Sequence, residues 1–175
     1  MTTKRSFAAL ALVLSLAVPG AFAQKSADPL TSFKKVVAAC EAHVRALPPE
    51  SAKQLKTGEW AHNFHEITSI AHDVKRTDSL VSPFTAYIRV ESLSYVVRKP
   101  SEDEARAVSK QERSISRGIQ ELRYAFQDSK LKLMNGTSRH EFKLAGQTSF
   151  SDHLGEVEVS AGEIASNSRW SGCLP

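Results

Sequence analysis

No apolar segment in this sequence is long enough to cross a membrane. The longest one runs from Phe7 to Val18, about twelve residues, whereas a spanning helix needs about twenty. The chain also lacks internal repeats, low-complexity tracts and the G-x-S-x-G elbow of many hydrolases. These absences exclude a helical membrane protein and a repeat array, and no motif in the chain indicates a particular reaction.

The start of the chain has the order typical of a secretory signal peptide. A charged start, an apolar run, a helix-breaking pair and a small-residue site follow one another: Lys4-Arg5, Phe7–Val18, Pro19-Gly20 and Ala21–Ala23. We therefore expect residues 1–23 to be a signal peptide that is cleaved before Gln24. No cysteine stands at that site, which argues against a lipid anchor. The expected location is the periplasm or the extracellular space.

The mature chain has no strong excess of charge of either sign. Removing Lys4 and Arg5 from the 23 Lys and Arg residues leaves 21, against 19 Asp and Glu. This balance gives no indication of a nucleic-acid partner. Residues 24–175 have the length of one domain, which buries enough surface to fold without a metal. We expect a single globular α+β domain over this range.

Cysteine is scarce, since only Cys40 and Cys173 occur. In an exported chain, two cysteines most simply form one disulfide. Closing so long a loop stabilises a fold by roughly 4–5 kcal/mol in the chain-entropy model. A reactive thiol is the alternative, but no basic residue adjoins Cys173, and Cys40 lies on an apolar helical stripe. We predict this disulfide and no catalytic, cofactor or metal residue.

An amphipathic helix is predicted from Asp28-Pro29 to Leu47. Asp at the N-cap and Pro at the first helical position are typical of a helix start, and Pro48-Pro49 ends the pattern. The apolar positions step by three and four residues and form one stripe: Leu30, Phe33, Val37, Cys40, Val44 and Leu47. If Cys40 pairs with Cys173, the C-terminal tail must dock on this helix.

Alternating apolar residues predict several strands after the helix. The predicted strands are residues 64–76, 84–97, 119–128, 130–134, 139–144 and a short one near 156–159. Asn135-Gly136 is a typical hairpin turn, and residues 145–155 are expected to form a loop. In the predicted strand 84–97 the apolar residues change from even-numbered to odd-numbered positions after Val90. We call this change the parity switch. Its cause is either a β-bulge near Glu91–Ser92 or burial of the strand on both faces.

Ser101 followed by Glu104 resembles a capping box and predicts a polar helix through about Gln111. An exposed insertion is the alternative. The whole layout is then one helix packed on a curled antiparallel sheet. This order of elements is similar to that of cystatin-like and NTF2-like α+β folds.

The densest group of candidate ligands is His62, His65 and His72 with Glu66. A metal needs three or four convergent donors. On a strand, however, His65 points away from His62 and His72. We therefore predict no specific metal site here.

Four further features have both a possible functional role and a purely structural explanation. Ser149 or Ser151 with Asp152-His153 has the residue types of a hydrolase triad but not its usual spacing. Four carboxylates are candidates for acid/base work: Glu66, Asp73, Glu91 and Glu141. A cationic hairpin face is predicted from Lys130, Lys132, Arg139, His140 and Lys143. It is suited to an anionic polymer, to an acidic partner or simply to solvent. Asn135-Gly136-Thr137 also matches a glycosylation sequon.

Three functions fit these observations. The first is a small exported binding or accessory protein without catalysis, which uses a sheet face or pocket lined by some of its aromatic residues: Trp60, Phe64, Phe84, Tyr87, Tyr95, Tyr124 and Phe126. The second is a small enzyme with Glu66, His72 or Glu91 as acid or base. The third is a secreted inhibitor or surface antigen, which needs loops near 79–83 and 135–138 on one edge. No cofactor is expected, and the partner is an unknown protein or small ligand.

Overall fold

The chain winds back and forth through one antiparallel sheet whose strand order follows the sequence. The computed structural model describes residues 28–175, apart from the side chains of residues 152–154, so the predicted signal peptide lies outside the described residues. The six strands are β1 (Glu50–Gln54), β2 (Trp60–Arg76), β3 (Phe84–Lys99), β4 (Ser114–Gln127), β5 (Lys130–Lys143) and β6 (Ser151–Ser160). The predicted antiparallel sheet is thus confirmed.

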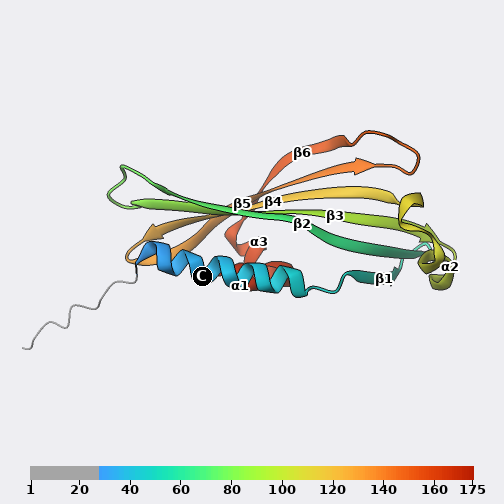
Figure 1. Ribbon diagram of the computed structural model, residues 1–175, viewed down its shortest axis with the longest axis horizontal. Helices are drawn as coiled ribbons and strands as arrows, with labels where there is room; N and C mark the ends of the chain where they lie inside the picture. Colours follow the sequence, from blue (N-terminus) through green and yellow to red (C-terminus); the bar gives the residue numbers. More distant parts are fainter. Residues whose placement is uncertain (1–27) are drawn as a thin grey trace, which may run out of the picture.

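One long helix, α1 (Pro29–Ala46), packs along one face of this sheet (Figure 1). We call this face the helix-side face and the opposite one the outer face. The Asp28 carboxylate accepts a hydrogen bond from the Thr31 backbone N–H at 3.0 Å, so the predicted N-cap is present. The helix is the first element of the described part, not the start of the chain. No helix among residues 28–175 is long and apolar enough to span a bilayer.

The core lies between α1, the middle of the sheet and the C-terminal tail. From α1 it includes Phe33, Val37, Cys40 and Val44, from the sheet Ile88, Val90, Leu122 and Tyr124, and from the tail Ile164, Trp170 and Cys173. The tail forms a short helix α3 (Ala161–Ser166) and a 3₁₀ helix η2 (Ser168–Cys173). Cys40 and Cys173 form the predicted disulfide, and the Tyr124 hydroxyl donates to the Cys173 carbonyl at 2.8 Å.

The predicted β-bulge lies in β2 and not in β3. The β2–β3 register shifts between Ile67 and Ser69, opposite Ser92 and Glu91. The parity switch in β3 therefore follows the second alternative, burial of the strand on both faces. The two faces are covered at different points along the strand. The helix-side face of β3 is buried under α1 around Val90, while near the far end α2 (Glu102–Ala107) contacts β2 and β3.

The prediction of a hairpin turn at Asn135-Gly136 is wrong. These residues lie inside β5, and the turn between β4 and β5 is Asp128–Ser129, both with positive φ. Gly136 is required for close packing, because a Cβ there would lie 2.6 Å from the Glu121 carbonyl oxygen and 3.1 Å from Ile164 Cδ1. The sequence signal for a turn arose from a glycine on which α3 packs.

The polar helix after Ser101 forms, but it is shorter than predicted. It ends at Ala107 and is followed by a 3₁₀ turn, η1 (Lys110–Glu112). The predicted loop over residues 145–155 is also too long, since β6 already begins at Ser151. Both differences concern the ends of elements, which local patterns define least well.

The helix covers only part of the helix-side face because it is shorter than the strands. Its 18 residues span about 27 Å, whereas the 17 residues of β2 span about 56 Å. Beyond α1 the chain continues beneath the sheet to β1 (Figure 1). The far part of the helix-side face is therefore left without a covering helix, and its side chains are mostly polar.

Candidate functional site

A polar trough lies on the helix-side face beyond the end of α1. Its floor is a cross-strand row of one residue from each of β2 to β5: His65, Ser94, Ser116 and Phe142. Its other walls come from the α1–β1 connection and from η2, including Leu47, Pro48, Glu50, Ser168 and Arg169. The volume of this hollow is about 590 Å³, so it has room for a small ligand.

His65 and Arg169 lie in direct contact within the trough although they are 104 residues apart. Arg169 Nη2 donates to His65 Nε2, because a guanidinium has donors only. The other ring nitrogen, Nδ1, lies 2.9 Å from Ser94 Oγ. With Nε2 accepting, Nδ1 carries the proton and donates it to Ser94. The His65 ring is therefore neutral and both its nitrogens are engaged.

The electrostatic surroundings keep His65 neutral. Burial of the ring and the nearby positive charge of Arg169 lower the pKa of His65 to about 4. Burial also lowers the pKa of Arg169, whose charge persists at physiological pH because the ordinary pKa of arginine is so high. The trough thus holds one fixed positive charge.

Arg169 has no carboxylate partner in the part of the chain that the structure describes. None of the ion pairs within residues 28–175 includes it, and its Nε is buried without a hydrogen-bond partner among these residues. Its guanidinium lies 5.5 Å from the Trp170 ring centroid, within cation–π range. Glu50, which lines the trough, lies instead 3.5 Å from His62 and 3.6 Å from Arg106.

Further polar side chains separate the trough from the apolar core. Gln120 Nε2 donates to Ser138 Oγ at 3.0 Å, and this hydroxyl lies 3.2 Å from His140 Nε2. All three residues lie on the helix-side face, because Gln120 pairs with Ser138 and His140 pairs with Gly118. Polar groups therefore continue across the sheet at positions where a sheet buried on this face would carry apolar residues.

The predicted arrangement of the three histidines is wrong. The shift at Ile67/Ser69 inverts the parity of β2, so His65 and His72 lie on the helix-side face and His62 on the outer face. His62 is buried and accepts from Arg113 Nη1 at 2.7 Å, while His72 is exposed beside the Phe33 ring. No group of three metal-ligating side chains gathers in the part of the chain that the structure describes.

The four candidate carboxylates lie apart from the trough. Glu66 pairs with Lys110 at 2.7 Å and Glu91 with Arg89 at 3.1 Å, both on the outer face. Glu141 pairs with Arg117 and Arg139, and Asp73 lines a different hollow, described below. Glu66, Glu91 and Glu141 therefore have separate cationic partners among the described residues.

The remaining predicted groups are also dispersed. Ser151 Oγ donates to the Phe142 carbonyl at 3.1 Å, and Ser149 is exposed. The side chains of Asp152 and His153 lie outside the described residues. The predicted cationic face forms in part: Lys130, Lys132, Arg139 and Lys143 share the outer face of β5 and His140 lies on the other.

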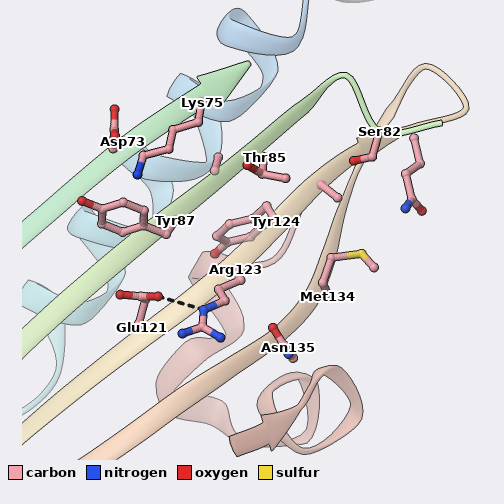
Figure 2. A pocket seen from close by; sticks show the side chains of 13 residues that line it. Asp73, Lys75, Ser82, Thr85, Tyr87, Glu121, Arg123, Tyr124, Met134 and Asn135 are labelled. Atoms are coloured by element: carbon pink, nitrogen blue, oxygen red, sulfur yellow. Dashed lines mark hydrogen bonds and ion pairs between the residues drawn. The ribbon is translucent and has the colours of Figure 1, made fainter. Parts of the chain in front are cut away.

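A second hollow of about 410 Å³ lies on the outer face, mainly over β2 to β5 (Figure 2). Asp73, Tyr87 and Thr85 line it together with Arg123 and Glu121. Here the charges compensate each other, because Arg123 donates to Glu121 at 2.8 Å. The trough is the stronger candidate, since Arg169 has no such acidic partner among residues 28–175.

Sequence reasoning did not identify Arg169, Ser94 or Ser116 as site residues. A signal was present, because serine occupies alternate positions 92, 94, 114 and 116 near the ends of two predicted strands. No pattern linked these serines to an arginine in the C-terminal tail. Neither a family model, nor a curated protein, nor a solved structure matches this chain.

Proposed function

We propose that this protein is a small exported binding or accessory protein without catalysis, and that its polar trough binds a ligand through an anionic group such as a carboxylate, phosphate or sulfate. The observation that carries this proposal is the half-buried Arg169, which has no acidic partner among the described residues. A partly desolvated cation without a counter-ion is unfavourable, and a bound anion would relieve this cost.

The groups around Arg169 suit an anion. A guanidinium binds carboxylate or phosphate oxygens through two parallel hydrogen bonds. Ser94 accepts from His65 Nδ1, so its own hydroxyl proton is free to point toward a ligand. Ser116 is its cross-strand neighbour. His65 contributes by holding Arg169 in place, not by contacting the ligand.

The alternative of a small enzyme is supported less well. Its proposed acid or base residues, Glu66, His72 and Glu91, do not converge in one pocket among the described residues. His65 is a poor general base because both its nitrogens are engaged. The inhibitor or antigen alternative needed residues 135–138 in an edge loop, and these residues lie within β5.

Export is the second part of the proposal. It rests on the predicted signal peptide over residues 1–23 and on the Cys40–Cys173 disulfide, which is typical of oxidising compartments. We also propose that the fold belongs with the cystatin-like or NTF2-like layouts, on the basis of one helix packed across an antiparallel sheet.

The binding proposal is tested by titrating the oxidised, exported protein with phosphate, sulfate and succinate while recording tryptophan fluorescence. Trp170 adjoins Arg169, so occupancy should change its emission, and a Trp60→Phe background isolates this signal. We expect saturation by at least one probe. Arg169→Gln should weaken its binding at least about tenfold, since hydrogen bonds to charged groups contribute roughly 1.5–3 kcal/mol.

The matched control is Arg45→Gln, an exposed arginine on α1 paired with Glu41, which should bind like the wild type. No saturable change with any probe up to ~10 mM, or equal affinity in Arg169→Gln, would contradict the proposal. Native mass spectrometry of protein purified from its own host would then identify the natural ligand by its retained mass.

A further inference from the structure

The loop between β2 and β3 exposes two consecutive aliphatic residues. This loop, residues 77–83, lies at the end of the sheet where α1 begins (Figure 1). The Leu80 side chain is 100% exposed and that of Val81 72% exposed. Aliphatic side chains so fully exposed and adjacent in sequence form a projecting apolar tip, which we call the β2–β3 tip.

The loop is ordered by its own polar groups. The Thr77 hydroxyl donates to the Ser82 carbonyl and accepts from the Ser79 N–H at 3.3 Å. The Ser79 hydroxyl accepts from the Ser82 N–H at 3.1 Å, and the Thr77 N–H donates to the Pro83 carbonyl at 2.9 Å. Polar groups therefore satisfy each other within the loop while Leu80 and Val81 project outward.

Basic residues surround the tip. Lys75 and Arg76 end β2, and Lys130 begins β5 at the same end of the sheet, because Arg76 pairs with Phe84, Phe84 with Phe126 and Gln127 with Lys130. None of these three cations belongs to an ion pair in the described part of the chain. Two nearby carboxylates, Asp78 in the loop and Asp73 on β2, carry the opposite charge. A third, Asp128, is paired with Lys132.

We propose that the β2–β3 tip inserts into an anionic lipid surface, with Lys75, Arg76 and Lys130 against the headgroups. A projecting tip of two side chains is too small for a stable protein interface, which needs about 1,000 Å² or more. A membrane contact has no such requirement, because apolar insertion and attraction of each basic residue to anionic lipid add together. The tip is independent of the trough and of the function proposed for it.

The test is co-sedimentation of the oxidised, exported protein with vesicles of phosphatidylglycerol and phosphatidylethanolamine, compared with pure phosphatidylcholine vesicles. We expect binding to the anionic vesicles only, weakened by added salt because the charge term is screened. Leu80→Ser combined with Val81→Ser should reduce binding at least about tenfold. Arg76→Gln combined with Lys130→Gln should also reduce it at least about tenfold.

Matched controls use the opposite end of the sheet. Leu144→Ser removes an aliphatic side chain that is 60% exposed just after β5, and Lys56→Gln removes an exposed cation before β2. Both should bind like the wild type. Circular dichroism verifies that each variant is folded. No binding to anionic vesicles, equal binding to phosphatidylcholine, or binding unaffected by the Leu80/Val81 change would overturn the proposal.

Discussion

At the scale of the residue, the chemistry of His65 depends on a register shift two residues further along the strand. Without the shift at Ile67/Ser69, His65 and His72 would lie on opposite faces. With it, both face the helix side, and His65 meets Arg169 and Ser94. A single inserted residue thus decides which histidine lies in the trough.

We expect His65 to make the stability of the protein depend on pH. Its pKa is about 4 in the folded chain and about 6.5 when unfolded, so between these values the unfolded chain binds the extra proton. The stabilisation from neutral His65 is complete above pH 6.5 and is lost as the pH falls toward 4. The expected loss from pH 7 to pH 5 is about 1 kcal/mol, allowing for the half-exposed ring.

Thermal unfolding of wild type and His65→Gln at pH 7 and pH 5 measures this contribution. On acidification, the melting temperature of the wild type should fall by about 2–4 °C more than that of the variant. His72→Gln, which changes an exposed histidine on the same face, should retain the wild-type pH dependence. Equal pH dependence in His65→Gln and the wild type would show that His65 is not responsible.

At the scale of the element, α1 and the C-terminal tail depend on each other. Trp170 is 4% exposed, and Cys40 and Cys173 are fully buried. The His43 ring nitrogen Nε2 lies 2.9 Å from the Ser168 carbonyl oxygen, a second tie between α1 and η2. The tail also contacts the sheet through Tyr124 and His65, but the buried Trp170, the disulfide and His43 tie it mainly to α1.

We expect loss of the disulfide to loosen the tail before the sheet. The bond joins residues 133 apart, and the double change Cys40→Ser and Cys173→Ser should lower the free energy of unfolding by up to about 4–5 kcal/mol in the chain-entropy model. Hydrogen exchange should accelerate first in residues 160–175, while amides of β3 and β4 keep most of their protection. Unchanged stability together with unchanged Trp170 emission would contradict this role.

At the scale of the whole molecule, the difference in length between helix and strands divides the helix-side face into a covered apolar part and an uncovered polar part. The core fills the first and the trough occupies the second. The proposed binding function follows from this division, because the uncovered part places polar side chains around Arg169, which has no ion-pair partner among residues 28–175. Residues 24–175 remain predicted as one domain, which should unfold in a single calorimetric transition.

We expect the exported protein to begin at Gln24. The segment 1–23 has the charged start, short apolar run and small-residue site that signal peptidase requires. Intact-mass measurement of protein recovered from outside the cytoplasm should give the mass of residues 24–175 with one disulfide, two mass units below the reduced form. A mass that includes residues 1–23 would show that the segment is retained and would favour a membrane-tethered protein instead.

The sequence by itself determined the elements whose cause is local. The cap at Asp28, the apolar stripe of α1 and the alternation in β3 and β4 all act within a few residues. The disulfide followed as well, because a chain that is predicted to be exported and has two cysteines leaves one pairing. The sequence could also place Ser101 at a helix start, although not where that helix ends.

Tertiary structure decided the features that depend on distant neighbours. The bulge lies in β2, opposite Glu91 and Ser92 of β3. The apolar pattern of β3 changes at these two residues, so the sequence pattern placed the bulge in β3 and not in its neighbour. Asn135-Gly136 indicated a turn, but Gly136 lies within β5, where α3 packs on it. Arg169 meets His65 only because the disulfide and the buried Trp170 hold the tail against α1. No local pattern encodes a contact over that separation, so the trough could not be read from the sequence.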